Sequence, residues 1–238
     1  MGTVRFEQPL IEGTLIERRR KFVAEVKLNN GDEIKAHCAN PGSLLSCSEP
    51  GSKVLVSVHD SPRSRFKHHL EIIYAGRVPV GVHTGRPAGV VAEAIGQAKI
   101  RDLAGYATLG RDTSNGRSTR IDLVAKGNGL RPCYMKVENV TLVANGTAFF
   151  PDLVVPSGPQ HMHDLTNLVR EGNRAMIMLV AQRSDATQLR LADKIDPEYT
   201  QAFRDAVARG VEALCFRAKV TRKGIQLDEP LPIDMSES

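Results

Sequence analysis

The chain has 238 residues, of which 41% are hydrophobic, enough apolar material for one large packed domain or two small ones. It carries 32 Lys and Arg against 27 Asp and Glu, a net charge of +5 that suits a polyanionic partner without requiring one. Because it has neither an apolar run of membrane-spanning length nor the apolar core of a signal peptide near its N-terminus, we expect a cytoplasmic protein and exclude a membrane protein.

The first third of the chain is a series of short strand-like segments without a long helix. These segments are residues 14–16, 22–28, 33–36, 53–57 and 70–73. A tight turn is predicted at residues 29–32, which read NNGD. Five short strands are typical of an OB-like β-barrel. We therefore place such a barrel in residues 1–80 and make it the candidate DNA-binding domain, because it holds 12 Lys and Arg against 9 Asp and Glu.

Two clusters of basic side chains fall within the predicted barrel. Their members are Arg18, Arg19, Arg20, Lys21, Arg63, Arg65 and Lys67. On the face of a barrel such side chains follow a phosphate backbone, whereas in an ordinary loop they are only solvated charge. We predict phosphate contacts, and the solvated alternative stays open at this point.

The cysteines predict a reduced protein. Cys38, Cys47, Cys133 and Cys215 show no C-x-x-C spacing and fall mostly in apolar segments, which is typical of thiols in a core. A zinc site made from Cys38, Cys47 and His37 is the weaker alternative, because a paired knuckle is missing.

Residues 81–238 alternate between helical and strand-like patterns. Helices are expected at residues 87–102, 159–171 and 197–209, and strands at 175–181 and 211–218, which predicts a mixed α/β domain around one sheet. Glu93 lies off the apolar stripe of the first helix. It is a candidate metal ligand, and a solvated glutamate is the simpler alternative.

A charged hairpin occupies the middle of this second domain. Side chains alternate between apolar and polar over residues 133–140, so Lys136 and Glu138 share one face of a strand. The dipeptide NG at 128–129 predicts a turn that folds residues 120–126 back onto this strand. One extra residue near Pro132 would bring Asp122 onto the same face. The layout resembles that of PD-(D/E)XK nucleases, whose acids hold Mg²⁺, although spacing alone favours a solvated ion pair.

The chain as a whole resembles the sugar fermentation stimulation protein A (SfsA) family from about residue 9 to residue 232. The matching words are LIER at 15–18, RKF at 20–22, CANPGS at 38–43, EPGS at 49–52, EAI at 93–95, RID at 120–122, VTL at 140–142, FPD at 150–152 and QRSDA at 182–186. Their occurrence together and in this order is far more specific than any one of them.

The resemblance implies an N-terminal OB-like barrel joined to a restriction-endonuclease-like (PD-(D/E)XK) α/β domain, with non-specific DNA binding as the family's recorded activity. This interpretation assigns catalytic positions to Asp122, Lys136 and Glu138, and metal positions to Asp122, Glu138 and Glu93. The family's usual strand reads Glu-Val-Lys, whereas residues 136–138 here read Lys-Val-Glu, so the two charges are exchanged. Other departures from the family pattern are Ser157, Gln160, His68 and Leu70.

We therefore expect a DNA-binding protein without sequence preference and with weak Mg²⁺ binding, and the family name adds a regulatory link to carbohydrate metabolism. The alternative is a Mg²⁺-dependent DNA phosphodiesterase. The exchange would impair it, because residues i and i+2 lie about 6.6 Å apart along a strand. A third hypothesis is a protein-interaction role in which the site is vestigial.

Overall fold

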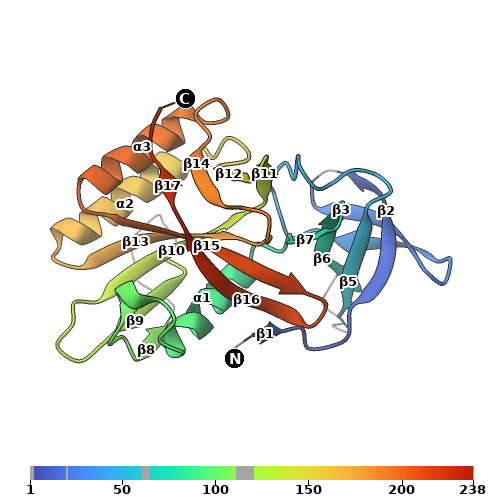
Figure 1. Ribbon diagram of the computed structural model, residues 1–238, viewed down its shortest axis with the longest axis horizontal. Coiled ribbons are helices and arrows are strands. Elements are labelled where there is room, and N and C mark those ends of the chain that lie inside the picture. The colour runs from blue at the N-terminus through green and yellow to red at the C-terminus, as the bar shows by residue number, and fades with distance from the viewer. Residues whose placement is uncertain (1–2, 20, 60–64, 111–120, 238) are drawn as a thin grey trace.

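The computed structural model describes residues 3–19, 21–59, 65–110 and 121–237. Figure 1 shows two units side by side, a small β-barrel and a larger unit in which helices pack on a sheet. This arrangement is the mixed α/β architecture with an N-terminal barrel that the sequence predicts.

The barrel is built from strands of five to nine residues each. Its strands are β2 (Ile11–Arg19), β3 (Val23–Leu28), β4 (Glu33–His37), β5 (Lys53–Val58) and β6 (His68–Ala75), and β7 (Val78–Gly81) extends the sheet beyond β6. The order is β4-β3-β2-β5-β6-β7, and a parallel pairing of β4 with β6 closes the barrel. On β3 the residues Ala24, Val26 and Leu28 point into the barrel core, as the period of two requires.

The larger unit is organised on a seven-stranded sheet. Its order is β1 (Val4–Arg5), β16 (Gly224–Leu231), β15 (Glu212–Thr221), β13 (Arg174–Ala181), β10 (Cys133–Val140), β9 (Leu123–Lys126) and β8 (Thr108–Gly110). Strand β13 lies at the centre, parallel to both neighbours, and residues 175–181 are fully buried. The near-continuous apolar run predicts this position, because a strand covered on both faces has no solvated side.

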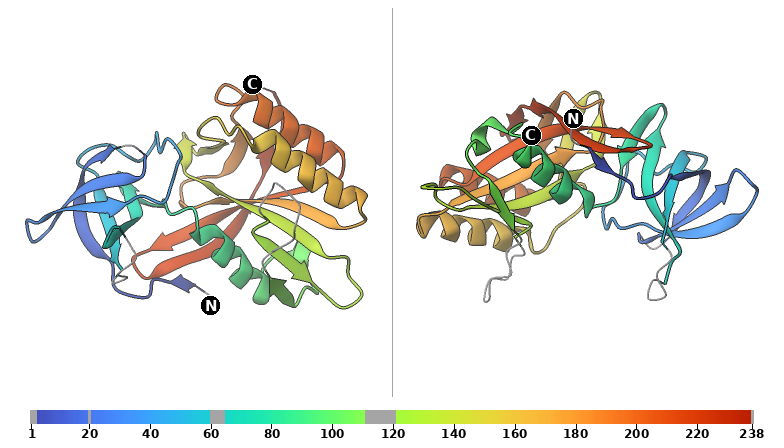
Figure 2. Two further views of the ribbon diagram at one scale, coloured as in Figure 1. Left: turned by 180° about the vertical axis from the view of Figure 1, so that it is seen from behind. Right: turned by 90° about the horizontal axis from the view of Figure 1, so that it is seen from below.

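Helices cover both faces of this sheet (Figure 2). Helix α1 (Arg86–Gly96) packs with the core on one face, and α2 (Gly158–Arg170) and α3 (Pro197–Ala208) pack on the other. A four-stranded sheet lies on the side of α2 and α3, in the order β11 (Leu142–Ala144), β12 (Thr147–Phe150), β14 (Gln188–Leu191) and β17 (Ile233–Asp234).

The helix ends agree with the predictions for α2 and α3 but not for α1. Asp196 caps α3 by accepting a hydrogen bond from the Tyr199 N–H at 3.0 Å. The predicted first helix was too long, since α1 ends at Gly96 and only a short 3₁₀ turn follows at Arg101–Leu103. Ala98 has a φ of +54°, which a continuing α-helix does not allow.

The N-terminal segment belongs to both units. β1 pairs antiparallel with β16 in the large sheet, and the chain then enters the barrel through β2. The barrel strands end at Gly81 and α1 begins at Arg86. The division at residue 80 remains a prediction, and the pairing of β1 shows that residues 4–5 pack with the second unit.

The cysteines agree with the expectation of reduced thiols in a core. All four cysteines are buried free thiols, and burial raises the pKa of Cys47, Cys133 and Cys215 to about 12. Over the described ranges, no three His, Cys, Asp or Glu side chains are grouped so that they could hold a metal ion. None of the helices in those ranges is both long and apolar enough to cross a membrane.

Candidate functional site

The register of the β9–β10 hairpin decides which charges share a face. Cys133 pairs with Ala125, and Met135 pairs with Leu123. The Asp122 N–H continues the ladder by donating to the Met135 carbonyl at 3.0 Å. Continuing this register places Asp122 opposite Lys136. The loop therefore contains the one extra residue that is needed to put Asp122 on the same face as Lys136 and Glu138.

A lysine lies between two carboxylates on this face. The Lys136 Nζ is 3.0 Å from the Asp122 Oδ2 and 3.8 Å from the Glu138 Oε1. The same Asp122 oxygen accepts the Val137 N–H at 2.9 Å. Within the described residues the Asp122 Oδ1 has no hydrogen-bond partner, so one oxygen of the predicted acid remains available.

Glu138 is held in a poorly hydrated position. Its side chain is only 25% exposed, and burial together with the charge of Asp122 raises the pKa of Glu138, although Lys136 opposes that rise. Burial raises the pKa of Tyr199 well above its usual value, and the Glu138 charge adds to the rise. Glu138 thus takes up a proton more readily than an exposed glutamate does, which makes it a weaker ligand for a cation.

Asp122, Lys136 and Glu138 line a cleft of about 560 Å³ between the two units. Its walls come from residues 40–42 of the barrel, from Thr84, Gly85 and Ala88 around the start of α1, from residues 136–139 of β10, and from residues 150–156. Sequence patterns predict the charged strand but not the barrel wall, because that wall is brought in by packing. The word CANPGS at 38–43 was the only signal for it.

Arg18 holds the barrel loop that forms one wall of the cleft. Its guanidinium donates to the carbonyls of Asn40 at 2.6 Å, Gly42 at 2.8 Å and Ser43 at 3.2 Å, and to the Lys21 carbonyl at 2.9 Å. The planar fork of an arginine suits several carbonyls at once. The structure therefore gives Arg18 a role in holding the loop that lines the cleft.

Replacing Arg18 with Ala is expected to lower the free energy of unfolding by about 2 kcal/mol, because the loop carbonyls lose charged donors. Urea unfolding followed by circular dichroism measures this effect. The matched control is Arg19→Ala, since the exposed Arg19 forms ion pairs with Glu17 and Glu25 and its replacement should leave the midpoint nearly unchanged. Equal midpoints for the two variants would contradict the supporting role of Arg18.

Asp152 joins the two units at the edge of the cleft. Its backbone carbonyl accepts the Ser43 hydroxyl at 2.7 Å, and its carboxylate accepts the Leu44 N–H at 3.4 Å. A Cβ on Gly42 would lie only 2.6 Å from that carboxylate, so this close approach requires glycine. Asp152 therefore serves the junction as well as adding negative charge to the cleft.

Among the residues that the structure describes, the other predicted side chains do not line the cleft. Glu93 does not line it and accepts the Gln97 side-chain amide at 3.1 Å on α1. Arg65 lies over the Phe66 ring at 5.6 Å, and Lys21 and Lys67 are exposed on the barrel. Arg20 and Arg63 fall outside the described residues.

His161 on α2 is a neighbour of the charged strand. Burial lowers the pKa of His161, and the positive charge of Lys136 lowers it further. His163, two residues further along the helix, is exposed.

Comparisons with known proteins match the whole architecture. Two family models match, "SfsA N-terminal OB domain" over residues 16–82 and "Sugar fermentation stimulation protein RE domain" over residues 85–224. A sugar fermentation stimulation protein homolog of Geobacter sulfurreducens is 42% identical, covering 95% of this chain and 97% of its own length. One from Paramagnetospirillum magneticum is 38% identical, with 98% and 99% covered.

A solved structure has the same fold. It is described as "The structure of Pyrococcus Furiosus SfsA in complex with Ca2+", and it superposes with a TM-score of 0.88 at 19% identity, covering 98% of this chain and 99% of that chain. At this identity the likeness speaks for the fold, an OB-like barrel followed by an α/β unit.

Proposed function

The chain belongs to the sugar fermentation stimulation protein (SfsA) family, and from that premise we propose that it binds duplex DNA without reading its sequence. The observation that carries the proposal is the cleft between an OB-like barrel and an α/β unit, with Asp122, Lys136 and Glu138 on its wall. A regulatory link to carbohydrate use is part of the proposal through the family name alone.

Side chains on the barrel support nucleic-acid binding. Phe22 is 48% exposed and follows Lys21, and Phe66 lies beneath the guanidinium of Arg65. An exposed ring beside a cation is the combination on which nucleic-acid bases stack. Lys21 and Arg65 are exposed, whereas the guanidinium of Arg18 is held by backbone carbonyls.

Divalent metal binding at the cleft is the second part of the proposal. The Pyrococcus furiosus protein is described in complex with Ca²⁺, and here the Asp122 Oδ1 and the Glu138 carboxylate are the oxygens that would hold a hard cation. The fit is poor, because the Lys136 ammonium lies within 4 Å of both carboxylates and repels a cation. We infer weak binding of Mg²⁺ or Ca²⁺.

A Mg²⁺-dependent phosphodiesterase is the alternative function, favoured by the two carboxylates that face one cleft. A bound ion would polarise a phosphate oxygen and lower the pKa of a water molecule. The paired lysine opposes that role, so we propose little or no nicking of plasmid DNA by the chain as it stands.

DNA affinity is expected to fall steeply with salt, because each phosphate contact releases a condensed counterion. Fluorescence anisotropy with a short duplex, at low and moderate salt and for two unrelated sequences, measures this effect. We expect the two sequences to give the same affinity at each salt concentration. No binding at low salt, or an affinity that salt does not change, would contradict the proposed function.

A further inference from the structure

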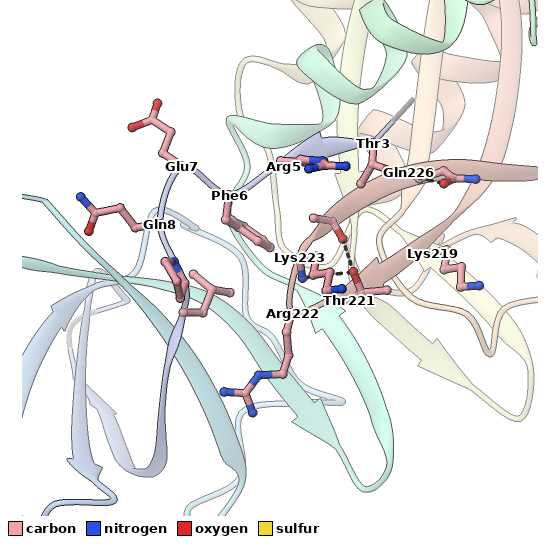
Figure 3. A pocket seen from close by; sticks show the side chains of 13 residues that line it. Thr3, Arg5, Phe6, Glu7, Gln8, Lys219, Thr221, Arg222, Lys223 and Gln226 are labelled. Carbon is pink, nitrogen blue, oxygen red and sulfur yellow. Dashed lines mark hydrogen bonds between the residues drawn. The ribbon is translucent and has the colours of Figure 1, made fainter. Parts of the chain in front are cut away.

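A second groove lies between the N-terminal segment and the β15–β16 hairpin (Figure 3). It has a volume of about 810 Å³ and is lined by residues 3, 5–10, 219, 221–224 and 226. It shares no lining residue with the carboxylate cleft. The two sites can therefore be altered separately.

Three basic side chains of the groove have no acidic partner among the residues that the structure describes. Arg5, Lys219 and Lys223 are exposed, and none of them forms an ion pair with any residue that the structure describes. Arg222 differs, because it pairs with Glu12. The acidic lining residue, Glu7, points away from the two lysines in Figure 3.

The backbone beneath these cations is fixed. Arg5 pairs with Gly224 across the β1–β16 ladder, and the Phe6 N–H donates to the Lys223 carbonyl at 3.2 Å. The strands approach so closely that a Cβ on Gly224 would lie 2.3 Å from the Val4 carbonyl oxygen. Cations whose backbone is already ordered lose less conformational entropy when they meet an anion.

The groove contrasts with the basic cluster on the barrel. There Arg18 donates to four carbonyls and Arg19 pairs with two glutamates, so the donors of these two side chains are already occupied. In the groove, Arg5, Lys219 and Lys223 line a concave surface without an ion-pair partner among the described residues. The polar side chains of Thr221 and Gln226 line the same surface. A chain of phosphates matches this arrangement, because it offers several anions in a row.

We propose that this groove is a main contact for the phosphodiester backbone of DNA, through Arg5, Lys219 and Lys223. The inference rests on the proposed DNA binding and adds a location to it. Neither the fold family nor the charged hairpin assigns this surface.

The test is the triple variant Arg5→Gln, Lys219→Gln and Lys223→Gln, compared with the unmodified chain by anisotropy with a short fluorescent duplex. Three lost phosphate contacts should lower affinity at least tenfold at low salt and make the slope of log K against log salt shallower by up to about three. The matched control is Lys99→Gln, Lys126→Gln and Arg209→Gln. It removes the same charge from exposed cations that line neither the groove nor the cleft.

Three outcomes are distinguishable when the melting temperatures of the variants match that of the unmodified chain. If the groove variant binds DNA more weakly and with a shallower salt dependence, while the control variant binds like the unmodified chain, the groove contacts the DNA backbone. If both variants lose affinity equally, the effect is one of net charge and the inference is wrong. If the groove variant binds like the unmodified chain, the inference is wrong but the proposed function stands, because that function is tested by the binding and salt dependence of the unmodified chain.

Discussion

Replacing Arg86 with Ala is expected to lower the free energy of unfolding by about 3–5 kcal/mol, because it leaves the buried Glu71 carboxylate without its partner. Glu71 on β6 is 1% exposed, and the first residue of α1 reaches it with two hydrogen bonds of 2.6 and 3.1 Å. Ser57 supplies a further hydrogen bond at 2.9 Å. The pair joins the barrel to the α/β unit, so its loss should loosen both. Urea unfolding at neutral pH measures the change.

The pH dependence of this loss provides a control. Burial by itself raises the pKa of Glu71, but the hydrogen bonds and charge of Arg86, together with His83 and the Ser57 hydrogen bond, outweigh burial and lower the pKa below its ordinary value of 4.5. A lowered folded-state pKa means stabilisation that is present above the unfolded pKa and is lost as the pH falls through the folded one. The difference between the unmodified chain and Arg86→Ala should therefore shrink in acid. A difference that stays constant from neutral to acid pH would show that the loss does not come from the ion pair.

Arg86→Lys is a matched variant that keeps the positive charge but not the two hydrogen bonds of the guanidinium group. It should restore part of the lost stability, since a lysine makes one charged contact where the arginine makes two. A variant with both Glu71→Leu and Arg86→Leu should also recover much of it, because no buried charge is then left unpaired. Failure of both to exceed Arg86→Ala would contradict this account of the pair.

Local patterns predict much of this fold because their causes are local. The alternation over residues 133–140 and the apolar run that becomes β13 predict their strands correctly, and Asp196 with Pro197 predicts the start of α3. The strands β1, β7, β8, β11, β12, β14, β16 and β17 were not predicted. β1 has two residues and is held by a partner more than 200 positions away, and β7 contains Pro79, which normally argues against a strand.

The charged face of the site is predictable for the same reason, because hairpin register follows from turn length and parity. The opposite wall is not, since residues 40–42 reach the cleft only through packing of the barrel against the α/β unit. A run of arginines in a sequence likewise does not show which side chains are solvated and which bond to the protein backbone. Arg18 bonds to carbonyls, whereas the free cations of the groove are scattered between Arg5 and Lys223.

Exchanging the charges of β10, as Lys136→Glu with Glu138→Lys, is expected to strengthen Mg²⁺ binding at least tenfold. In the unmodified chain an ammonium lies 3.0 Å from Asp122, in the position where a second carboxylate would complete a metal site. The exchange puts a carboxylate beside Asp122 and moves the ammonium about one strand repeat, roughly 6.6 Å, along the face. Tenfold corresponds to about 1.4 kcal/mol, a modest demand for replacing a cation with an anion next to a divalent ion.

The single variant Lys136→Gln separates the two parts of this effect. It removes the repelling ammonium without adding a ligand, so its Mg²⁺ affinity should lie between those of the unmodified and exchanged chains. Asp122→Asn in the exchanged chain should abolish the gain, because Asp122 is the proposed ligand in both arrangements. An exchanged chain that keeps its affinity without Asp122 would bind the ion elsewhere.

The central claim is that Lys136 occupies the place of a metal-binding acid in this chain. Calorimetric titration of Mg²⁺ into the unmodified and exchanged chains, under one set of conditions, tests it most directly. We expect weak binding with little heat for the unmodified chain and a clear single-site isotherm for the exchanged one. If the unmodified chain binds Mg²⁺ as tightly as the exchanged chain, the claim is wrong, and Glu138 reaches the ion from its present position.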